Sequence, residues 1–319
     1  MSPQPAPRPG VSSAGGPAKG AGKPPPPVPW RRARNADKPM IERLLTAQYA
    51  SSMFPLADLR DHGLDGLAPR GLHVWFSPDD SGLVALSNNG VLMPQLPRLR
   101  PADGAGLRLA LDGKTIRQII GPDAQLRNLI KALALDEAPV RSAARQPGFT
   151  LSLADLKLPE AEDLDLRATH VSDRPLLTRW RAAYLVEVRN LAPGKAAQIA
   201  AEEVDGFLAG RNHRILMQGA RAVAMTGFTA VHGTVAQVGG VFTPVELRKR
   251  GFARAAVALH LAEMRDRGLR TAVLYAASDP AARAYRALGF RPSHTMGLIS
   301  FAADQTVTAP PAPPPEAER

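Results

Sequence analysis

The sequence predicts an α+β protein with a mixed, mostly antiparallel sheet flanked by helices. Two observations carry this prediction. The elements expected in residues 164–301 follow the order strand, two helices, three antiparallel strands, helix, strand, helix and strand, which differs from a regular alternation of parallel β-α units. A fainter version of the same order occupies residues 39–135. We therefore expect two tandem domains of similar fold.

The first domain is expected to begin with a helix and to continue with short β runs. The turn signals Asp79-Asp80-Ser81-Gly82 and Asn88-Asn89-Gly90 separate these runs. A further strand, the turn Gly121-Pro122-Asp123 and a helix with apolar positions three and four residues apart complete the domain. The expected helices cover residues 39–49 and 124–135, and the expected strands cover 72–76, 83–87, 91–96 and 115–120.

The second domain repeats this order more completely. Gly268 and Gly289 each follow an expected helix and act as stop signals. The expected strands cover residues 164–170, 214–218, 222–230, 235–243, 271–276 and 295–301, and the expected helices cover 176–188, 195–208, 250–267 and the residues before 288.

Composition defines the two ends of the chain. The 319 residues include 45% hydrophobic residues and 31 prolines, of which ten lie within residues 1–38 and five within 309–319. Such segments are extended and mobile. We expect a disordered basic Pro/Gly-rich tail at 1–36, a first domain at 37–158, a second at 159–303 and a disordered Pro-rich tail at 304–319.

Composition also excludes several classes of function. The chain has no cysteine, which excludes disulfides, a thiolate nucleophile and Cys-ligated zinc. The seven histidines form no H-E-x-x-H motif, so we expect no metal, and His260 is expected to pack or to lie on the surface. No apolar run approaches the roughly 18 residues of a membrane span, and the predicted location is cytoplasmic. The basic tail supplies +6 of the net +11, which favours only non-specific contacts with nucleic acid.

A basic loop precedes an Ala-rich helix in the second domain. Arg248, Lys249 and Arg250 stand directly before Gly251. The first amides of a helix lack internal partners, and the helix dipole adds positive potential, so this junction favours a bound anion. Gly251 and Ala253 leave room for phosphate oxygens to reach the backbone. The spacing fits neither G-x-x-x-x-G-K-[ST] nor G-x-G-x-x-G.

This segment, with a second motif after it, closely resembles the acetyl-CoA-binding core of the GNAT acyltransferases. The family signature is a strand, a Q/R-x-x-G-x-G/A loop and a helix, then a strand and a helix that ends in Y-x-x-x-G-F. Arg248, Gly251 and Ala253 fill the loop positions, and Tyr285, Gly289 and Phe290 fill the last motif. The resemblance covers roughly residues 37–303 and is strong from 163 onward.

The resemblance implies where the cofactor acetyl-CoA binds. Backbone groups near Val241 and Thr243 would pair with the pantetheine amides, and the pyrophosphate would lie over the amides of residues 249–253. Tyr285 would protonate the departing thiolate, because a phenol stays protonated at neutral pH. Ser278 stands where the family often has Asn, and either Ser278 or Asp279 can instead cap the helix. The cofactor-binding residues implied are Val241, Phe242, Thr243, Arg248, Lys249, Arg250, Gly251, Phe252, Ala253 and Ser278.

The residue that deprotonates the acceptor amine is left open by the sequence. Glu187 is one candidate, since Trp180, Tyr184 and Glu187 share one helix face that borders the acceptor pocket in the family. That face is equally typical of an amphipathic helix with a solvated acid. Glu246 and a water chain are the alternatives.

The resulting prediction is an acetyl-CoA-dependent N-acetyltransferase that acts by direct attack in a ternary complex. The acceptor would be a primary amine of a small molecule or peptide. The first half resembles a degenerate GNAT domain, because residues 119–124 stand where the basic loop is expected and carry no Arg or Lys. Two alternatives stay open, namely a non-catalytic acyl-CoA-binding or sensing module and a protein that binds nucleic acid through its tail.

Overall fold

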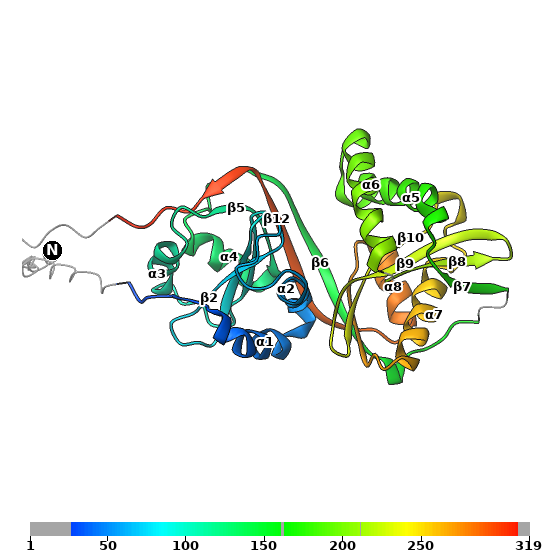
Figure 1. The fold of residues 1–319 in the computed structure, drawn as a ribbon, viewed down its shortest axis with the longest axis horizontal. Coiled ribbons are helices and arrows are strands. Elements are labelled where there is room, and N and C mark those ends of the chain that lie inside the picture. The colour runs from blue at the N-terminus through cyan, green and yellow to red at the C-terminus, as the bar shows by residue number, and fades with distance from the viewer. Residues whose placement is uncertain (1–26, 161–162, 211, 312–319) are drawn as a thin grey trace, which may run out of the picture.

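The computed structural model describes residues 27–160, 163–210 and 212–311, which form two lobes (Figure 1). Most of the expected tails, residues 1–26 and 312–319, lie outside the described residues. Each lobe repeats the order strand, two helices, three antiparallel strands, helix, strand and helix, which confirms the predicted α+β fold. The described strands belong to one 12-stranded mixed sheet that runs through both lobes.

The expected elements keep close to their predicted boundaries, and the structure adds β1, α2, α3 and β6, which the sequence did not predict. The N-terminal lobe contains β1 (Arg31–Arg32), α1 (Lys38–Ala47), α2 (Tyr49–His62), β2 (Leu72–Phe76), β3 (Leu83–Ser87), β4 (Val91–Gln95), α3 (Asp103–Ala110), β5 (Thr115–Pro122) and α4 (Asp123–Ala132). The C-terminal lobe contains β7 (Leu164–Ala168), α5 (Arg174–Arg189), α6 (Pro193–Gly210), β8 (His213–Gln218), β9 (Arg221–His232), β10 (Val235–Phe242), α7 (Phe252–Asp266), β11 (Thr271–Tyr275) and α8 (Asp279–Ala287). Two long strands, β6 (Val140–Ser152) and β12 (Arg291–Thr306), run between the lobes.

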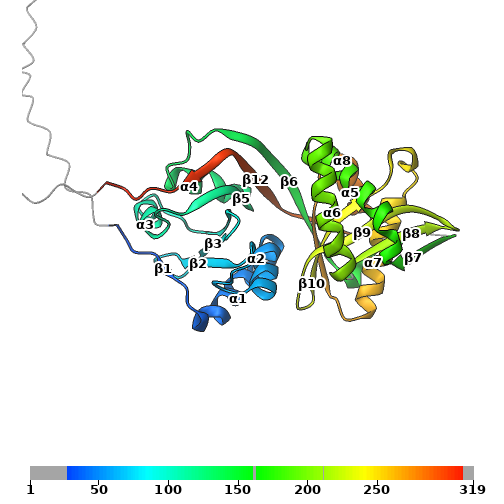
Figure 2. The ribbon, with the colours of Figure 1, turned by 45° about the horizontal axis from the view of Figure 1, so that its top comes forward.

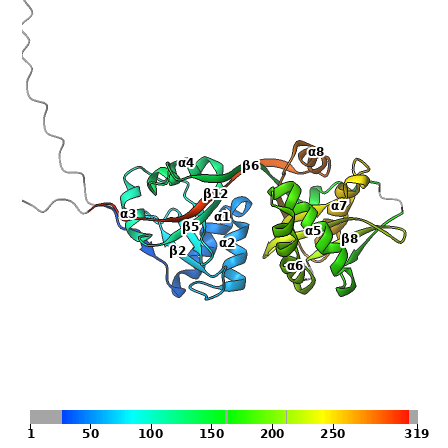
Figure 3. The same ribbon diagram turned by 90° about the horizontal axis from the view of Figure 1, so that it is seen from above.

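These two strands exchange places between the lobes. The sheet order places β12 between β5 and β6, and β6 between β12 and β11. The distal part of β12 pairs with β5 of the first lobe, whereas the last residues of β6 pair with β11 of the second. Figure 2 and Figure 3 show β6 and β12 lying side by side across the junction. Each lobe is therefore completed by a strand that comes from the other half of the sequence.

The exchanged strands carry core residues with them. Phe301 and Val307 are each 1% exposed and pack in the core of the N-terminal lobe, while Phe149 and Leu151 pack in the core of the C-terminal lobe. The last strand is longer than predicted and runs to Thr306, because Gln305 and Thr306 resume pairing with β5 after a bulge.

The folded chain also begins earlier than the sequence predicts. The expected tail reached residue 36, yet Trp30 is only 7% exposed and its indole N–H donates to the Asp103 carbonyl at 3.1 Å. β1 follows directly and pairs with β2. Burial of one large aromatic ring and its paired N–H account for this early start.

Helices cover both faces of the sheet in the C-terminal lobe. α7 and α8 pack on one face through a cluster that includes Val257 and Leu288. α5 and α6 pack on the other through Trp180 and Val204. On that second face α2 of the N-terminal lobe covers the part nearest the junction, and its Met53 packs in one cluster with residues of β9 and β11.

The strand exchange predicts that the C-terminal strand stabilises the N-terminal lobe. Replacing Phe301 with alanine should lower the free energy of unfolding by about 3–5 kcal/mol, because it leaves a cavity in that core. Val140→Ala is the matched control on the neighbouring strand. Val140 is 50% exposed, so the change should be within about 0.5 kcal/mol. Denaturant unfolding measures the free energy of both variants. If Phe301→Ala destabilises the protein no more than Val140→Ala does, the Phe301 side chain contributes nothing to that core.

Candidate functional site

The site begins where two parallel strands separate. β10 and β11 pair through Val235, Ala236 and Gln237 only, and the pairing ends there. Beyond this point β10 carries a bulge, with a register shift against β9 between Gly239 and Phe242. Gly240 has φ +64° within the bulge, a conformation that glycine adopts without strain. The strands thus leave backbone groups facing a gap between them.

The basic loop leads from β10 to the N-terminus of α7. Gly251 has φ +82° and precedes the first helical residue, and the first intrahelical bond joins the Ala255 amide to the Gly251 carbonyl. The amides of residues 252–254 consequently have no partner within the helix. The Arg250 guanidinium lies 4.9 Å from the centre of the Phe252 ring, beside these amides. This end of α7 combines unpaired donors, a helix dipole and a cation.

Arg248 ties the loop to α5. Its two terminal nitrogens donate to the two carboxylate oxygens of Glu187 at 2.7 and 2.6 Å, and its Nε donates to the Thr243 carbonyl at 3.0 Å. The hydrogen bonds from Arg248 hold the pKa of Glu187 below its ordinary value. In this arrangement Glu187 is an ionised anchor for Arg248. The Thr243 carbonyl, expected to face the cofactor, is bonded to Arg248.

Tyr285 is a residue of α8, and its side chain packs in the core of the C-terminal lobe. The side chain is 8% exposed and its ring lies 6.0 Å from that of Phe290, so the two motif aromatics pack together. Burial, with a smaller contribution from the phenol of Tyr184, raises the pKa of Tyr285 above its ordinary value. The phenol therefore keeps its proton at every physiological pH.

The remaining expected residues lie at the end of β10, in the loop after it and at the start of α8. Phe242 is buried and its ring lies 6.3 Å from that of Trp180, which seats α5 against the end of β10. Ser278 caps α8, since its hydroxyl accepts from the Ala281 amide at 3.4 Å. Glu246 is exposed in the 3-10 helix Val245–Leu247. Val241 is half-buried, while Lys249 and Arg250 are exposed.

Three polar residues of the central strands were not singled out from the sequence. His213 is 4% exposed, stacks on Phe207 at 3.7 Å, and places its ring against Gly227 and Gly240. Burial lowers the pKa of His213 to about 3, so the ring is neutral. Thr229 and Gln237 are joined by a 2.9 Å hydrogen bond next to the point where the strands separate. For Thr229 and Gln237 the available signal was a polar residue inside a largely apolar predicted strand, whereas His213 stands one residue before the strand predicted at 214–218.

The equivalent position in the N-terminal lobe is occupied by the chain's own side chains. β4 and β5 pair in parallel like β10 and β11, so the loop that matches the basic loop is 96–102, before α3. This corrects the sequence-based assignment of residues 119–124, which form the β5–α4 junction. Asp103, 2% exposed in the first turn of α3, accepts from the Arg100 amide at 3.0 Å, and Gln125 accepts from the Leu96 amide at 2.8 Å. A carboxylate thus lies where an anion would bind.

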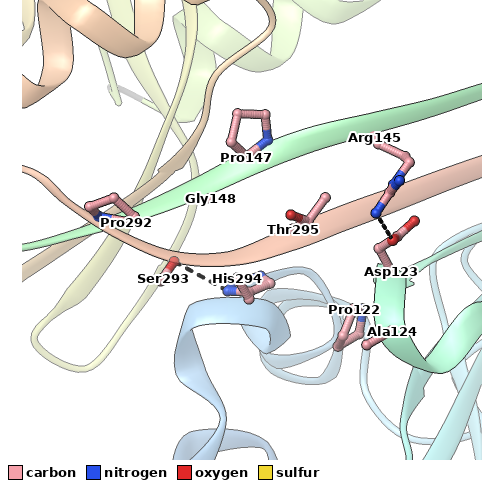
Figure 4. Close-up of a pocket in the computed structure, with 10 residues that line it drawn as sticks. All are labelled: Pro122, Asp123, Ala124, Arg145, Pro147, Gly148, Pro292, Ser293, His294 and Thr295. Atoms are coloured by element: carbon pink, nitrogen blue, oxygen red, sulfur yellow. Dashed lines mark hydrogen bonds and ion pairs between the residues drawn. The ribbon is translucent and has the colours of Figure 1, made fainter.

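A cavity of about 460 Å³ lies where β6 and β12 cross between the lobes (Figure 4). Its cationic side chain, Arg145, pairs with Asp123 at 2.6 Å, and the hydroxyl of Ser293 faces the ring of His294. The charge of Arg145 is therefore neutralised at the cavity wall. The basic loop before α7 is the better anion site.

Two searches of the described residues gave no candidate. Residues 27–160, 163–210 and 212–311 contain no group of three or more His, Asp or Glu side chains placed to hold a metal ion. Across the same residues, no helix combines the length and apolar character needed to traverse a bilayer.

Comparison with known proteins agrees with this geometry. Residues 199–293 match the family model of the acetyltransferase (GNAT) domain. A GCN5-related N-acetyltransferase from Kribbella flavida has a TM-score of 0.51 at 16% identity, covering 82% of this chain and 95% of its own. A tandem GNAT protein from the clavulanic acid biosynthesis pathway has 0.51 at 16% identity, covering 89% and 100%. A protein from Drosophila has 0.59 at 13% identity, covering 86% and 98%. No curated protein sequence matches significantly.

These findings define the class of protein. The C-terminal lobe carries a GNAT acetyltransferase domain. The chain as a whole has the tandem GNAT fold, with the second lobe as the one that keeps the basic loop.

The buried histidines predict a pH-dependent stability. Burial lowers the folded-state pKa of His213 and of His260 to about 3, whereas both titrate near 6.5 when unfolded. Between these values the unfolded chain binds more protons, so stability should fall as the pH drops below about 6.5. Because carboxylates add to this loss at lower pH, the histidine contribution is isolated by comparison with His260→Leu. That variant should lose stability less steeply, by up to about 1.4 kcal/mol per pH unit. Denaturant unfolding between pH 7 and 4.5 measures both slopes, and identical slopes would contradict a neutral buried His260.

Proposed function

We propose that the chain is an acetyl-CoA-dependent N-acetyltransferase that uses the C-terminal lobe. The observation that carries this proposal is the junction at Gly251, where the first amides of α7, the helix dipole and basic side chains come together in the loop that follows β10. A diphosphate is the anion best matched to a row of amides at a helix N-terminus. The match of residues 199–293 to an acetyltransferase domain supports coenzyme A as its source.

Different residues near the gap would hold different parts of the cofactor. The amides of residues 249–253 would bind the diphosphate, and Arg248, Lys249 and Arg250 would add charge. Val241 on the bulged end of β10 and the Thr243 amide just after it would offer backbone groups to the pantetheine arm, since the Thr243 carbonyl is bonded to Arg248. Phe252 supports the loop through Arg250, and Phe242 supports it through Trp180. Ser278 caps α8, a role that does not require the cofactor.

The acyl group supplied by the bound thioester would be transferred directly to an amine. The amine nitrogen attacks the acyl carbon, the carbon–sulfur bond breaks, and the thiolate takes a proton. Tyr285 is the proposed donor of that proton, since burial keeps the phenol protonated. Glu187 remains a candidate base, and to act so it must leave Arg248, because a paired carboxylate is a weaker base.

The acceptor is proposed to be a primary amine of a small molecule or peptide, and the site of action the cytoplasm. Neither a specific nucleic acid nor a membrane is expected as a partner, and no metal is required by this mechanism. The alternative is a module that binds acyl-CoA without transferring the acyl group. Release of free CoA that depends on an added amine distinguishes the two.

Acetyl-CoA should stabilise the protein against unfolding. At about a hundredfold excess over the dissociation constant, the stabilisation should be roughly 2.7 kcal/mol. Gly251→Glu should abolish it, because a side chain and a negative charge would enter the diphosphate site. Gly219→Glu is the matched control, since Gly219 also has positive φ and open space around it but lies in the β8–β9 turn. Titration calorimetry and thermal shift measure both variants. Retained affinity in Gly251→Glu would reject the site.

Tyr285→Phe should separate binding from chemistry. Acetyl-CoA affinity should be unchanged, and kcat should fall by about 10²–10⁴, the range for loss of a general acid. Tyr184→Phe, which changes the neighbouring phenol, is the matched control and should retain most of the activity. Unchanged kcat in Tyr285→Phe would remove the tyrosine from the mechanism and leave the cofactor site intact.

A further inference from the structure

The middle of β9 carries a polar side chain that the fold does not cover. Residues 223–228 and Ala230 are buried, whereas Thr229 between them is exposed. Helices cover both faces of the sheet around β9. α7 and α8 lie on one face, and α5, α6 and α2 lie on the other. The exposure of Thr229 marks an opening in that cover.

A bulge in β9 locates the opening on the sheet. Met225 and Gly227 alternate onto one face, and Thr229 is the extra residue of the bulge, because Phe228 pairs with Val238 while Ala230 pairs with Gln237. The Thr229 side chain lies on that same face, since it contacts Gln237 and the Cβ position of Gly239, which pairs with Gly227. Met225 lies under α5, in one cluster with Trp180. One residue beyond Thr229, Ala230 packs in the cluster that contains α2. Thr229 therefore lies on the uncovered strip between α5 of one lobe and α2 of the other.

Gln237 holds the Thr229 hydroxyl in place. Its Nε2 donates to Thr229 Oγ1 at 2.9 Å, so one lone pair of the hydroxyl is occupied. The hydroxyl donates to the main-chain carbonyl oxygen of Gln237, with 3.4 Å between the two oxygens. The second lone pair is then directed away from β10, toward the exposed side. The result is a fixed hydrogen-bond acceptor on the uncovered strip.

Gln237 itself is costly to bury and is not explained by packing. The side chain is 2% exposed, and its Oε1 has no hydrogen-bond partner among the described residues. Its neighbours on the sheet, Ala230 and Val273, are apolar and packed with α2. A buried unsatisfied amide oxygen destabilises a fold, so its presence calls for a functional reason. Gln237 is also the last residue of β10 that pairs with β11.

We propose that Thr229, oriented by Gln237, positions the acceptor amine. This inference rests on the proposed function, since it needs the acyl group at the gap between β10 and β11. Thr229 lies beside that gap, because a side-chain carbon on Gly239 would come within 2.4 Å of its methyl group. An amine that enters between α5 and α2 donates an N–H to the free lone pair of Thr229, which holds its nitrogen beside the acyl carbon. Gln237 acts through Thr229 and is a positioning residue.

Thr229→Val keeps the shape of the side chain and removes the hydroxyl. With n-butylamine as acceptor and saturating acetyl-CoA, we expect KM for the amine to rise about tenfold, the loss of one hydrogen bond, while acetyl-CoA affinity and Tm stay unchanged. Thr229→Ser should restore KM. Thr226→Val is the matched control, because Thr226 is 1% exposed and points to the opposite face of β9.

The outcomes separate this inference from the proposed function. If wild-type protein binds no CoA thioester by calorimetry, the proposed function fails. If it binds acetyl-CoA but Thr229→Val keeps a wild-type KM, or loses Tm and acetyl-CoA affinity instead, the amine subsite is wrong and the cofactor site stands. If wild-type turnover of n-butylamine is too slow to measure, the amine is titrated onto CoA-saturated protein with ¹³C-methyl-labelled threonine. A saturable shift of the Thr229 methyl supports the subsite, and its absence overturns it.

Discussion

The separation of β10 and β11 after Gln237 is the constraint on which the site depends. Backbone amides and carbonyls inside a sheet must find partners, and two strands that part leave theirs unpaired at the centre of the fold. The bulge at Gly240 turns β10 further from the ladder. The loop that follows then presents a second set of unpaired amides at the start of α7. In the proposed function one extended ligand with amides and a diphosphate would satisfy both sets together.

The two lobes treat the same constraint differently. In the N-terminal lobe β4 and β5 also separate, but Gln125 reaches back to the Leu96 amide and Asp103 takes the place of an anion at α3. The chain satisfies its own donors there. In the C-terminal lobe the first turn of α7 carries no acidic residue. The exchange of β6 and β12 joins the lobes into one sheet, and α2 of the N-terminal lobe packs against β9 and β11 of the other lobe.

The sequence predicts the order of elements and the basic loop well because both are local. Hydrophobic periodicity, turn residues and the run from Arg248 to Ala253 each depend on a few neighbouring residues. The strand exchange was not predictable in this way. Phe301 lay in a predicted strand and Phe149 in none, and only tertiary pairing decides which lobe each one completes. The wrong assignment of residues 119–124 has the same cause, since the strand order that identifies the true counterpart is a property of the sheet.

The same difference between local patterns and tertiary contacts applies to the site residues. The resemblance named Arg248 and Glu187 separately, from distant segments, and gave no reason to expect the paired hydrogen bonds between them. That contact makes Glu187 the ionised partner of Arg248. The hydrogen bonds to Glu187 and to the Thr243 carbonyl fix the position of Arg248 in the absence of a ligand. The same pairing links α5, which forms one wall of the amine entry, to the loop that would hold the cofactor. A diphosphate that draws Arg248 away would free the Glu187 carboxylate, so cofactor binding and the availability of a base are coupled through one ion pair.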